Sequence, residues 1–199
     1  MNYSNLAQSK TYSNLVNAFA GECQARTRYT MLAEKCKTAG FCALSKFVKT
    51  IAKNEFEHAE RIYNFIAASS DKAIPSLNVN SGYPFKEKEN DLIEAFRYAA
   101  ENEGEEAQEI YPSFSRIARE EGFDIIADFF EKLVQIESCH KKAFTELYEH
   151  LKNGTLYKRV NSIKWKCSLC GFEATAKEAW QKCPVCGAAQ GEIMLEMSE

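Results

Sequence analysis

The chain has no long hydrophobic run, which argues against a membrane-spanning helix. None of its apolar stretches approaches the roughly 18 residues that a membrane span needs. The first ten residues lack the basic-then-apolar layout of a signal peptide. The formal net charge of -3 gives no reason to expect nucleic acid or an anionic membrane as a partner. We therefore expect a cytoplasmic protein that binds neither.

Histidine is scarce, yet two of the 3 histidines follow a glutamate at the same spacing. Glu55 and His58 form one Glu-x-x-His motif, and Glu137 and His140 form the other. Residues three apart share a helix face, so each motif places a carboxylate beside an imidazole. The apolar residues in phase with the motifs are Phe47, Ile51, Ile62 and Phe65 around the first and Ile126, Phe130, Leu133, Phe144, Leu147 and Leu151 around the second. A buried carboxylate is costly unless it is paired or binds a metal, so both motifs predict metal ligands; the alternative is a solvated Glu–His pair.

Proline and glycine are few, at 4 and 9 residues, and they help to delimit four predicted helices. The helices are expected at about 5–37, 43–68, 91–121 and 124–152. Residues 69–90 are rich in Ser, Asn and Pro and are too many for a tight helix hairpin. This pattern predicts a mainly α fold, a ferritin-like four-helix bundle with a long crossover in the middle.

The third predicted helix carries five glutamates close together, and helical phase separates them. Glu103 and Glu106 share a stripe with Phe96, Ala99, Ile110 and Phe114 and should face inward, whereas Glu101, Glu105 and Glu109 should face solvent. Gly104 inside this helix costs about 1 kcal/mol relative to alanine, and a bare spot or a local bulge beside a metal would account for it. Pro112 is expected to kink the helix or to loosen one of its turns.

The two halves of the bundle match in spacing, which predicts a site for two metals. Glu22 precedes Glu55 by 33 residues, and Glu103 precedes Glu137 by 34. One Glu from each of two helices and a Glu-x-x-His from each of the other two is the ligand set of carboxylate-bridged di-iron or di-manganese bundles. Glu106 is one carboxylate beyond this set. It can exchange with a histidine as the metal charge changes, or it can hydrogen-bond a ligand or pair with Arg26.

The cysteine pattern points to a second metal site. Four of the 8 cysteines, Cys23, Cys36, Cys42 and Cys139, are scattered in helical sequence and are expected to be core or surface thiols. The other four form the pairs Cys167-x-x-Cys170 and Cys183-x-x-Cys186. Four thiolates suit a tetrahedral zinc or a single iron. Spacing alone favours zinc, but the glycine after each pair lets backbone N–H groups approach sulfur, and a redox bundle upstream favours iron as a one-electron carrier.

The composition changes near the end of the bundle, which predicts two domains. We expect the bundle at 1–152, a joint at 153–162 and a small four-cysteine domain at 163–199. The last segment is too short for a strong core of its own and is expected to depend on its metal. The shortness of the joint argues against this domain folding back onto its own bundle.

A ferritin-like bundle followed by a rubredoxin-like four-cysteine domain resembles the rubrerythrin family over essentially the whole chain. The segments that carry the resemblance are Phe19 to Glu22 and on to Arg28-Tyr29, Glu55 to His58, Glu103 to Glu106 with Tyr111 to Phe114, Glu137 to His140, and Cys183 to Gly187. The resemblance implies a non-haem di-iron peroxidase that reduces hydrogen peroxide to water in oxidative-stress protection, with electrons delivered through the four-cysteine iron.

The same resemblance implies a role for each site residue. The implied ligands are Glu22 on the first iron, Glu103 and His140 on the second, Glu55 and Glu137 as bridges, and His58 and Glu106 as a pair that exchanges on the first iron. Tyr29 and Tyr111 are implied to hydrogen-bond the ligand shell; the alternative is that they are core aromatics. The implied cofactors are two Fe ions in the bundle and one Fe on Cys167, Cys170, Cys183 and Cys186, with Zn able to occupy either site as isolated.

The resemblance also implies partners: a rubredoxin or an NAD(P)H-linked reductase as electron donor, and a homodimer in which the four-cysteine domain of one chain lies near the di-iron site of the other. The sequence has no dinucleotide fingerprint, so the chain itself is not expected to bind NADH. Two other functions compete with this one. The first is a ferroxidase or iron-handling protein that uses dioxygen, and the second is a helical interaction module with a structural zinc ribbon.

Overall fold

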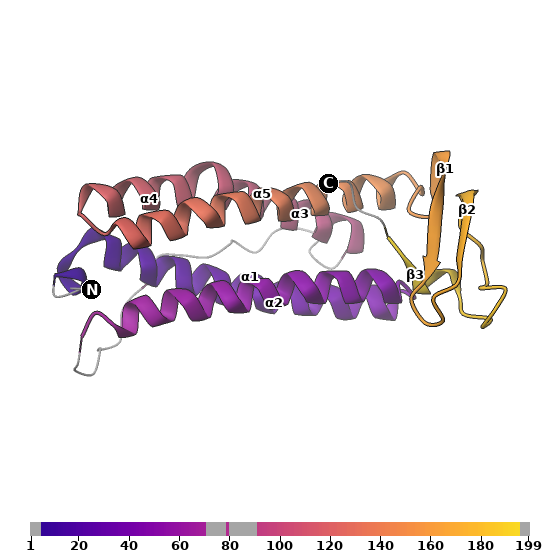
Figure 1. Ribbon diagram of the computed structural model, residues 1–199, viewed down its shortest axis with the longest axis horizontal. Coiled ribbons are helices and arrows are strands. Elements are labelled where there is room, and N and C mark those ends of the chain that lie inside the picture. The colour runs from indigo at the N-terminus through magenta and orange to yellow at the C-terminus, as the bar shows by residue number, and fades with distance from the viewer. Residues whose placement is uncertain (1–4, 71–78, 80–90, 196–199) are drawn as a thin grey trace.

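The computed structural model describes residues 5–70, 79 and 91–195, and these form a four-helix bundle followed by a small sheet domain (Figure 1). After a short turn of 3-10 helix, η1 (Leu6–Gln8), the helices of the bundle are α1 (Lys10–Thr38), α2 (Cys42–Ala67), the pair α3 (Leu92–Glu105) and α4 (Tyr111–Glu120), and α5 (Asp124–Lys152). Helix α1 packs against α2, and both α3 and α4 pack against α5. This confirms the mainly α, ferritin-like fold; the predicted 69–90 crossover lies almost entirely outside the described residues.

The helix ends follow from local sequence. Gly40 and Gly122 take positive φ values of 86° and 81° at the turns that end α1 and α4, a conformation that glycine adopts without strain. Asp91 caps α3, because its carboxylate accepts hydrogen bonds from the backbone N–H groups of Ile93 and Glu94. Local sequence thus accounts for the start of α3 and for the ends of α1 and α4.

The third predicted helix is not one continuous α-helix: a turn is loosened just before Pro112, which is one of the two outcomes that the sequence predicted for this proline. A π-helical turn, η2 (Glu106–Ile110), separates α3 from α4, and Pro112 lies in the first turn of α4. In this wider turn the N–H of Tyr111 bonds to the carbonyl of Glu106, five residues back. A proline without an N–H fits directly after such a turn because the regular i→i−4 bonding is already interrupted. The bulge expected near Gly104 is thus present, two residues further on.

The C-terminal domain is a small antiparallel sheet with strand order β2-β1-β3. Its strands are β1 (Lys158–Cys167), β2 (Glu173–Glu178) and β3 (Ile193–Met194), with a 3-10 turn, η3 (Gln190–Glu192), before β3. Trp165, Ala179 and Ile193 form its buried core, and the Trp165 indole N–H donates to the Ala176 carbonyl at 3.0 Å. So small a core agrees with a domain that needs its metal.

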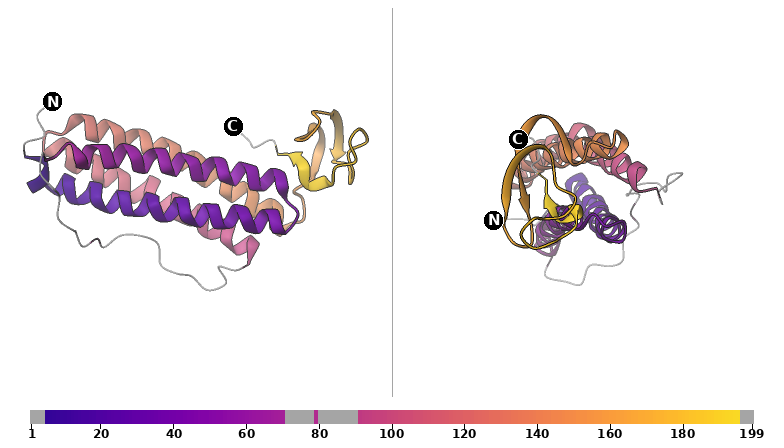
Figure 2. Two further views of the ribbon diagram at one scale, coloured as in Figure 1. Left: turned by 90° about the horizontal axis from the view of Figure 1, so that it is seen from below. Right: turned by 90° about the vertical axis from the view of Figure 1, so that its right-hand side faces the viewer.

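The sheet domain covers one end of its own bundle, at the turn between α1 and α2 (Figure 2). A Cβ placed on Gly191 would lie 1.7 Å from the Gly40 carbonyl oxygen, so the two backbones touch. The rings of Phe41 and Tyr157 stack with centroids 6.5 Å apart, and Leu156 belongs to the bundle core. The sequence argument against folding back is therefore wrong at this end of the bundle, because the joint itself packs there. The domain boundaries stay a prediction.

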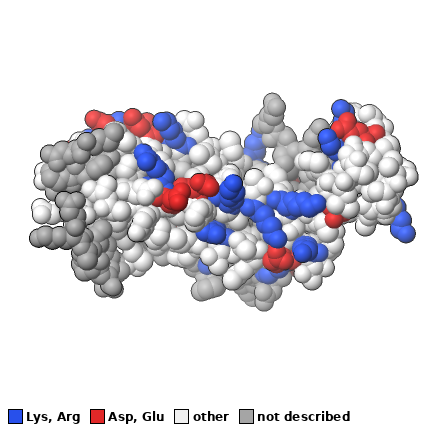
Figure 3. All heavy atoms as spheres, turned by 60° about the horizontal axis from the view of Figure 1, so that its bottom comes forward, with Lys and Arg blue, Asp and Glu red and all other residues white. Residues whose placement is uncertain are grey.

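The surface of the molecule carries charges of both signs. On the face seen in Figure 3, Lys and Arg side chains gather along the middle with Asp and Glu patches among them. Among the described residues, no helix combines the length and hydrophobicity that crossing a membrane would require.

Candidate metal centres

The middle of the bundle is polar although it is buried. Two hydrophobic clusters lie on either side of it, one including Leu32, Leu44, Val48, Phe96 and Phe144 and the other Leu15, Ile62, Phe65, Phe130 and Leu133. Between them the side chains of four glutamates, Glu22, Glu55, Glu103 and Glu137, are at most 1% exposed. Isolated carboxylates do not persist at such depth, so this polar layer needs a partner for its charge.

These glutamates and two histidines form two overlapping groups. One group is Glu22, Glu55, His58 and Glu137; the other is Glu55, Glu103, Glu137 and His140; within each, one ligand atom per residue lies within 4.8 Å of the others. Nδ1 of His58 is 3.1 Å from Glu55 and 3.2 Å from Glu137. Nδ1 of His140 is 3.1 Å from Glu55 and 2.8 Å from Glu137. Glu55 and Glu137 are common to both groups, which is the placement that two bridging carboxylates require.

The donor atoms of this layer fit two divalent cations. Within the part of the chain that the structure describes, the buried atoms without a hydrogen-bond partner include Oε2 of Glu22, Oε1 of Glu55, Oε2 of Glu103, both carboxylate oxygens of Glu137 and Nδ1 of His140. Native cores satisfy nearly all buried polar atoms, so five orphaned oxygens in one layer point to ions that they coordinate. Oxygen-rich donors with two imidazoles suit iron or manganese.

Two buried tyrosines hold the outer carboxylates of the layer. The Tyr29 hydroxyl donates to Oε1 of Glu103, and the Tyr111 hydroxyl donates to Oε1 of Glu22. In each case the orphaned Oε2 is the oxygen left free to face a metal. Such outer hydrogen bonds fix the orientation of a ligand. The structure therefore places both tyrosine hydroxyls on carboxylates that are candidate metal ligands.

Asn54 is a neighbour of the site that the sequence did not reveal. Its side-chain amide lies 3.4 Å from Nε2 of His140, the ring nitrogen that faces away from the carboxylates. A metal-bound histidine needs a partner for its other N–H, and an amide that presents its oxygen can provide it. Asn54 precedes Glu55 in a polar stretch, so no local pattern distinguished it.

Without metal, the layer shifts the pKa values of its own groups. Burial raises the pKa of Glu22 to about 8 and raises that of Glu103 well above its usual range. Burial would also raise the pKa of Glu55, but hydrogen bonds from His140 and His58 outweigh it and hold the value at about 2. Burial opposes the charged form of His58, yet its carboxylate neighbours raise the pKa to about 12. The metal-free layer thus keeps protons that metal binding would release.

We expect the metal-free protein to lose stability as the pH rises from about 6.5 to about 8. Glu22 and His58 have folded-state pKa values above their ordinary ones, so their contributions are present at low pH. Both contributions decrease with pH in this window because the folded state gives up protons that it binds more tightly than the unfolded state does. Thermal unfolding of metal-free and metal-loaded protein across this range measures the effect. The loaded protein serves as the control and should change less, and a metal-free melting temperature that rises with pH would contradict the expectation.

Glu106 is buried, 4% exposed, and it is the first residue of the π-helical turn. It belongs to neither of the two ligand groups, whereas His58 belongs to the first. In the structure His58 is therefore grouped with the other candidate ligands, and Glu106 is buried outside both groups. Glu101, Glu105 and Glu109 are exposed, as their helical phase predicted. Arg26, the alternative partner, lies with its guanidinium 4.3 Å over the Phe56 ring.

The four paired cysteines converge at the edge of the sheet domain. Sγ of Cys167 is 3.7 Å from that of Cys186, and Sγ of Cys170 is 3.6 Å from that of Cys183. Sulfurs bound tetrahedrally at about 2.3 Å from one ion would be separated by about 3.8 Å, so the cage already has the right size. The sulfurs of Cys167 and Cys183 sit on the buried side and those of Cys170 and Cys186 on the exposed side.

Backbone N–H groups point at the sulfurs of this cage. Burial would raise the pKa of Cys183, but N–H groups of Cys186 and Val185 bond its sulfur, and the pKa falls to about 7. Phe172 and Ala188, each directly after a glycine, bond the sulfurs of Cys170 and Cys186. The glycines Gly171 and Gly187 take positive φ values of 77° and 73°, which makes these approaches possible, as their positions in the sequence indicated.

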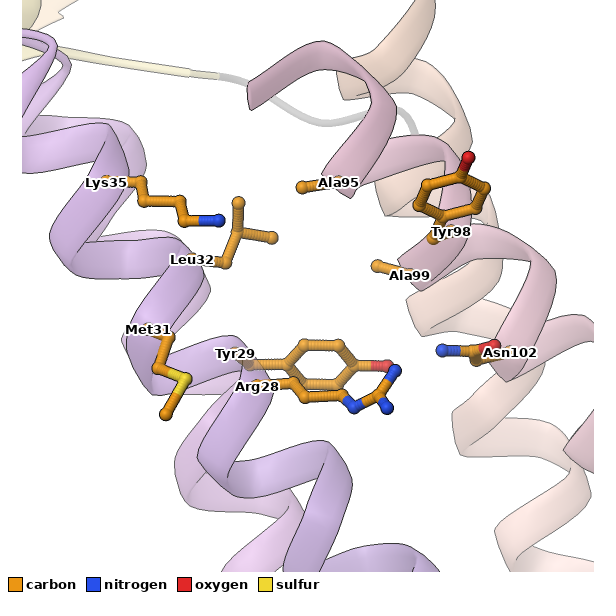
Figure 4. Close-up of a pocket in the computed structure, with 9 residues that line it drawn as sticks. All are labelled: Arg28, Tyr29, Met31, Leu32, Lys35, Ala95, Tyr98, Ala99 and Asn102. Atoms are coloured by element: carbon orange, nitrogen blue, oxygen red, sulfur yellow. The ribbon is translucent and has the colours of Figure 1, made fainter. Parts of the chain in front are cut away.

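A pocket of about 100 Å³ lies between α1 and α3 beside the polar layer (Figure 4). Tyr29 and Asn102 form part of its wall, and the side chains of Arg28 and Asn102 reach toward each other across the gap. Because the Tyr29 hydroxyl bonds Glu103, a single side chain separates the pocket from the candidate metal ligands. The volume is enough for a few molecules of the size of water.

Both parts of the chain match known protein families. The family model described as Rubrerythrin matches residues 13–148, and the one described as Rubrerythrin, rubredoxin-like domain matches residues 165–192. Rubrerythrin of Clostridium perfringens is 38% identical over 181 residues, covering 91% of each chain. Rubrerythrin of Porphyromonas gingivalis is 35% identical over 182 residues, covering 92% of this chain and 88% of its own length.

Solved structures share the fold at lower identity. Nigerythrin in its mixed-valence state superposes with a TM-score of 0.60 at 24% identity, covering 98% of this chain and 94% of its own. A bacterioferritin of Desulfovibrio desulfuricans superposes with a TM-score of 0.61 at 22% identity, covering 77% of this chain and 85% of its own. These likenesses show a common fold, and the bacterioferritin covers less of the chain.

Proposed function

This chain belongs to the rubrerythrin family, and from that premise we propose that it is a peroxidase that reduces hydrogen peroxide to water. Membership makes it an oxidoreductase that contributes to oxidative-stress protection. Membership and the two sites together confirm the predicted iron cofactors, two ions in the bundle and one on the four cysteines.

One observation carries the proposal: a single chain combines a buried carboxylate layer built for two ions with a four-thiolate cage. A ferroxidase needs the first and has no use for the second. An interaction module with a zinc ribbon would keep four carboxylates buried with only protons and two histidines to balance them, and would leave five of their oxygens without a hydrogen-bond partner, which is unfavourable. A peroxidase uses both, the layer for the reaction and the cage for the return of electrons.

In the proposed reaction, hydrogen peroxide takes up two electrons and two protons and leaves as two water molecules. Two ferrous ions, when bound, supply those electrons and carry the positive charge that favours departure of oxygen. Glu55 and Glu137 would hold the ions as a pair, while Tyr29 and Tyr111 keep the outer carboxylates oriented. The hydrophobic clusters on both sides exclude bulk water from this layer.

We assign the change of ligand on the first ion to His58 and Glu106. His58 Nδ1 faces the first group of ligands, and the Glu106 carboxylate is buried in the same core outside that group. An anionic oxygen suits the more oxidised ion and a neutral imidazole suits the ferrous one. The π-helical turn that begins at Glu106 gives this segment a backbone geometry that differs from the regular helix on either side.

Electron return is proposed to run between two chains. On α2, Glu55 lies 13 residues from Cys42, which is about 20 Å of helix, and the cage lies beyond that end of the bundle. Within one chain the two sites are therefore far apart. A homodimer with antiparallel bundles would bring the cage of one chain toward the carboxylate layer of the other. The external donor, a rubredoxin or an NAD(P)H-linked reductase, would meet the exposed cysteines Cys170 and Cys186.

We expect the reduced protein to reoxidise quickly with hydrogen peroxide and slowly with dioxygen. The test is an anaerobic experiment in which the fully reduced protein receives each oxidant in a separate run. The visible absorption of the oxidised thiolate iron is followed with time. A preference for dioxygen would overturn the peroxidase proposal in favour of a ferroxidase, for which a gel-filtration size far above that of a dimer would be further support.

A further inference from the structure

A lysine of the bundle contacts the loop that carries the first two cysteines of the cage. Nζ of Lys46, on α2, lies 3.0 Å from Oε2 of Glu192 and 3.1 Å from Oγ of Ser168. Ser168 lies between Cys167 and Cys170, and its hydroxyl donates to the same Glu192 oxygen at 2.7 Å. One cation and one anion are thus fixed beside the cage, and the cation comes from the other domain.

Contacts between main-chain atoms hold these side chains close to one another. Gly191, next to Glu192, touches Gly40 so closely that an added Cβ would clash with the Gly40 carbonyl. The N–H of Ser168 donates to the Glu192 carbonyl at 2.8 Å, which ties the cysteine loop to the same segment. The position of Lys46 relative to the cage is therefore set by main-chain packing as well as by the ion pair itself.

The two charges act in opposite directions on iron in the cage. Four thiolates around ferric iron carry a net single negative charge, and reduction by one electron adds a second. A nearby ammonium stabilises the more negative reduced form, and a nearby carboxylate destabilises it. The Lys46 side chain is 57% exposed and that of Glu192 is 18% exposed, so solvent screens the lysine more than the carboxylate.

We propose that Lys46 and Glu192 set the reduction potential of the thiolate iron from the bundle side, the lysine raising it and the glutamate lowering it. Neither residue belongs to the cage, so both act on the iron only through their charge. The proposal requires iron in the cage and does not depend on which oxidant the carboxylate layer uses. By thermodynamic reciprocity, reduction of the cage also strengthens its contact with Lys46 and so holds the domain more firmly on the bundle.

The test is a redox titration of the full-length, iron-loaded protein with dithionite, followed by the visible absorption of oxidised thiolate iron. In Lys46→Gln the ratio of reduced to oxidised iron at a fixed solution potential should fall, and in Glu192→Gln it should rise, each by about two- to fivefold at low salt. Lys49→Gln is the matched control. Lys49 lies one turn further along α2 and pairs with Glu34 at 2.5 Å, away from the cage, so its replacement should leave the ratio unchanged.

Opposite shifts separate a charge effect from a structural one. If the substitutions only loosened the domain and let water reach the cage, both variants would move the potential in the same direction, and that result would overturn the proposal. Unchanged ratios in both variants would overturn it as well. Raising the ionic strength should shrink both shifts if charge is the cause. The titration involves neither peroxide nor dioxygen, so a negative result would leave the peroxidase proposal intact. Likewise, a preference for dioxygen over peroxide would leave the proposal on the reduction potential intact.

Discussion

Replacing Cys183 with serine should stop peroxide turnover that is driven by an external donor, to below roughly one-hundredth of the original rate. Cys183 is the sulfur whose pKa is lowered to about 7 by backbone N–H groups, so it is well suited to bind metal as a thiolate. A serine hydroxyl stays protonated at neutral pH and binds iron poorly. The donor then has no path to the bundle. The measurement is steady-state peroxide consumption with a reductase and its cofactor.

A single turnover should survive in the same variant. When the bundle is reduced chemically beforehand, one equivalent of hydrogen peroxide should still be consumed, because the carboxylate layer and its hydrogen bonds lie in the other domain. Cys139→Ser is the matched control, since this exposed thiol lies outside the cage and its replacement should affect neither assay. Loss of the single turnover together with the steady-state rate would show that the four-cysteine domain is needed for the bundle to fold, and not only for electron delivery.

The helices of the bundle could be predicted because burial follows a local period. The residues in phase with the two Glu-x-x-His motifs, such as Ile62 and Phe130, are fully buried in the structure. The π-helical turn could not be placed by the same reasoning, since a shift from i→i−4 to i→i−5 bonding changes no residue type. Gly104 and Pro112 showed that the third helix was irregular. They did not show that the irregularity begins at Glu106.

For the candidate sites, the spacing of residues predicted which side chains meet, and contacts between distant segments decided the rest. Glu22, Glu103 and the two motifs come together as their matched spacing indicated, although which of them bind metal stays a prediction. The contact of Lys46 with Glu192 joins residues 146 positions apart, and no local pattern announces it. Packing of the joint against the end of the bundle was missed for the same reason, because it depends on contacts such as that of Tyr157 with Phe41, residues far apart in the sequence.

Replacing Glu106 with glutamine should slow peroxide turnover by about 10- to 100-fold while both bundle ions remain bound. The glutamine keeps the size of the side chain in its buried position and removes the negative charge that the proposed ligand change requires. The two candidate ligand groups do not include Glu106, so metal content should not fall. Iron analysis and the rate of peroxide-driven reoxidation measure the two effects separately.

Glu109→Gln provides the matched comparison, because Glu109 lies in the same π-helical turn but is exposed. If the turn mattered only for folding, loss of the charge at Glu106 or at Glu109 would slow reoxidation to a similar extent. If Glu106 is a ligand that exchanges, only Glu106→Gln should slow it. The two variants should melt at similar temperatures once loaded with iron. Equal reoxidation rates in the Glu106 variant and the unchanged protein would remove the reason to treat this carboxylate as a ligand. His58 would then be left as the permanent ligand of the first ion, with the π-helical turn serving to place Pro112.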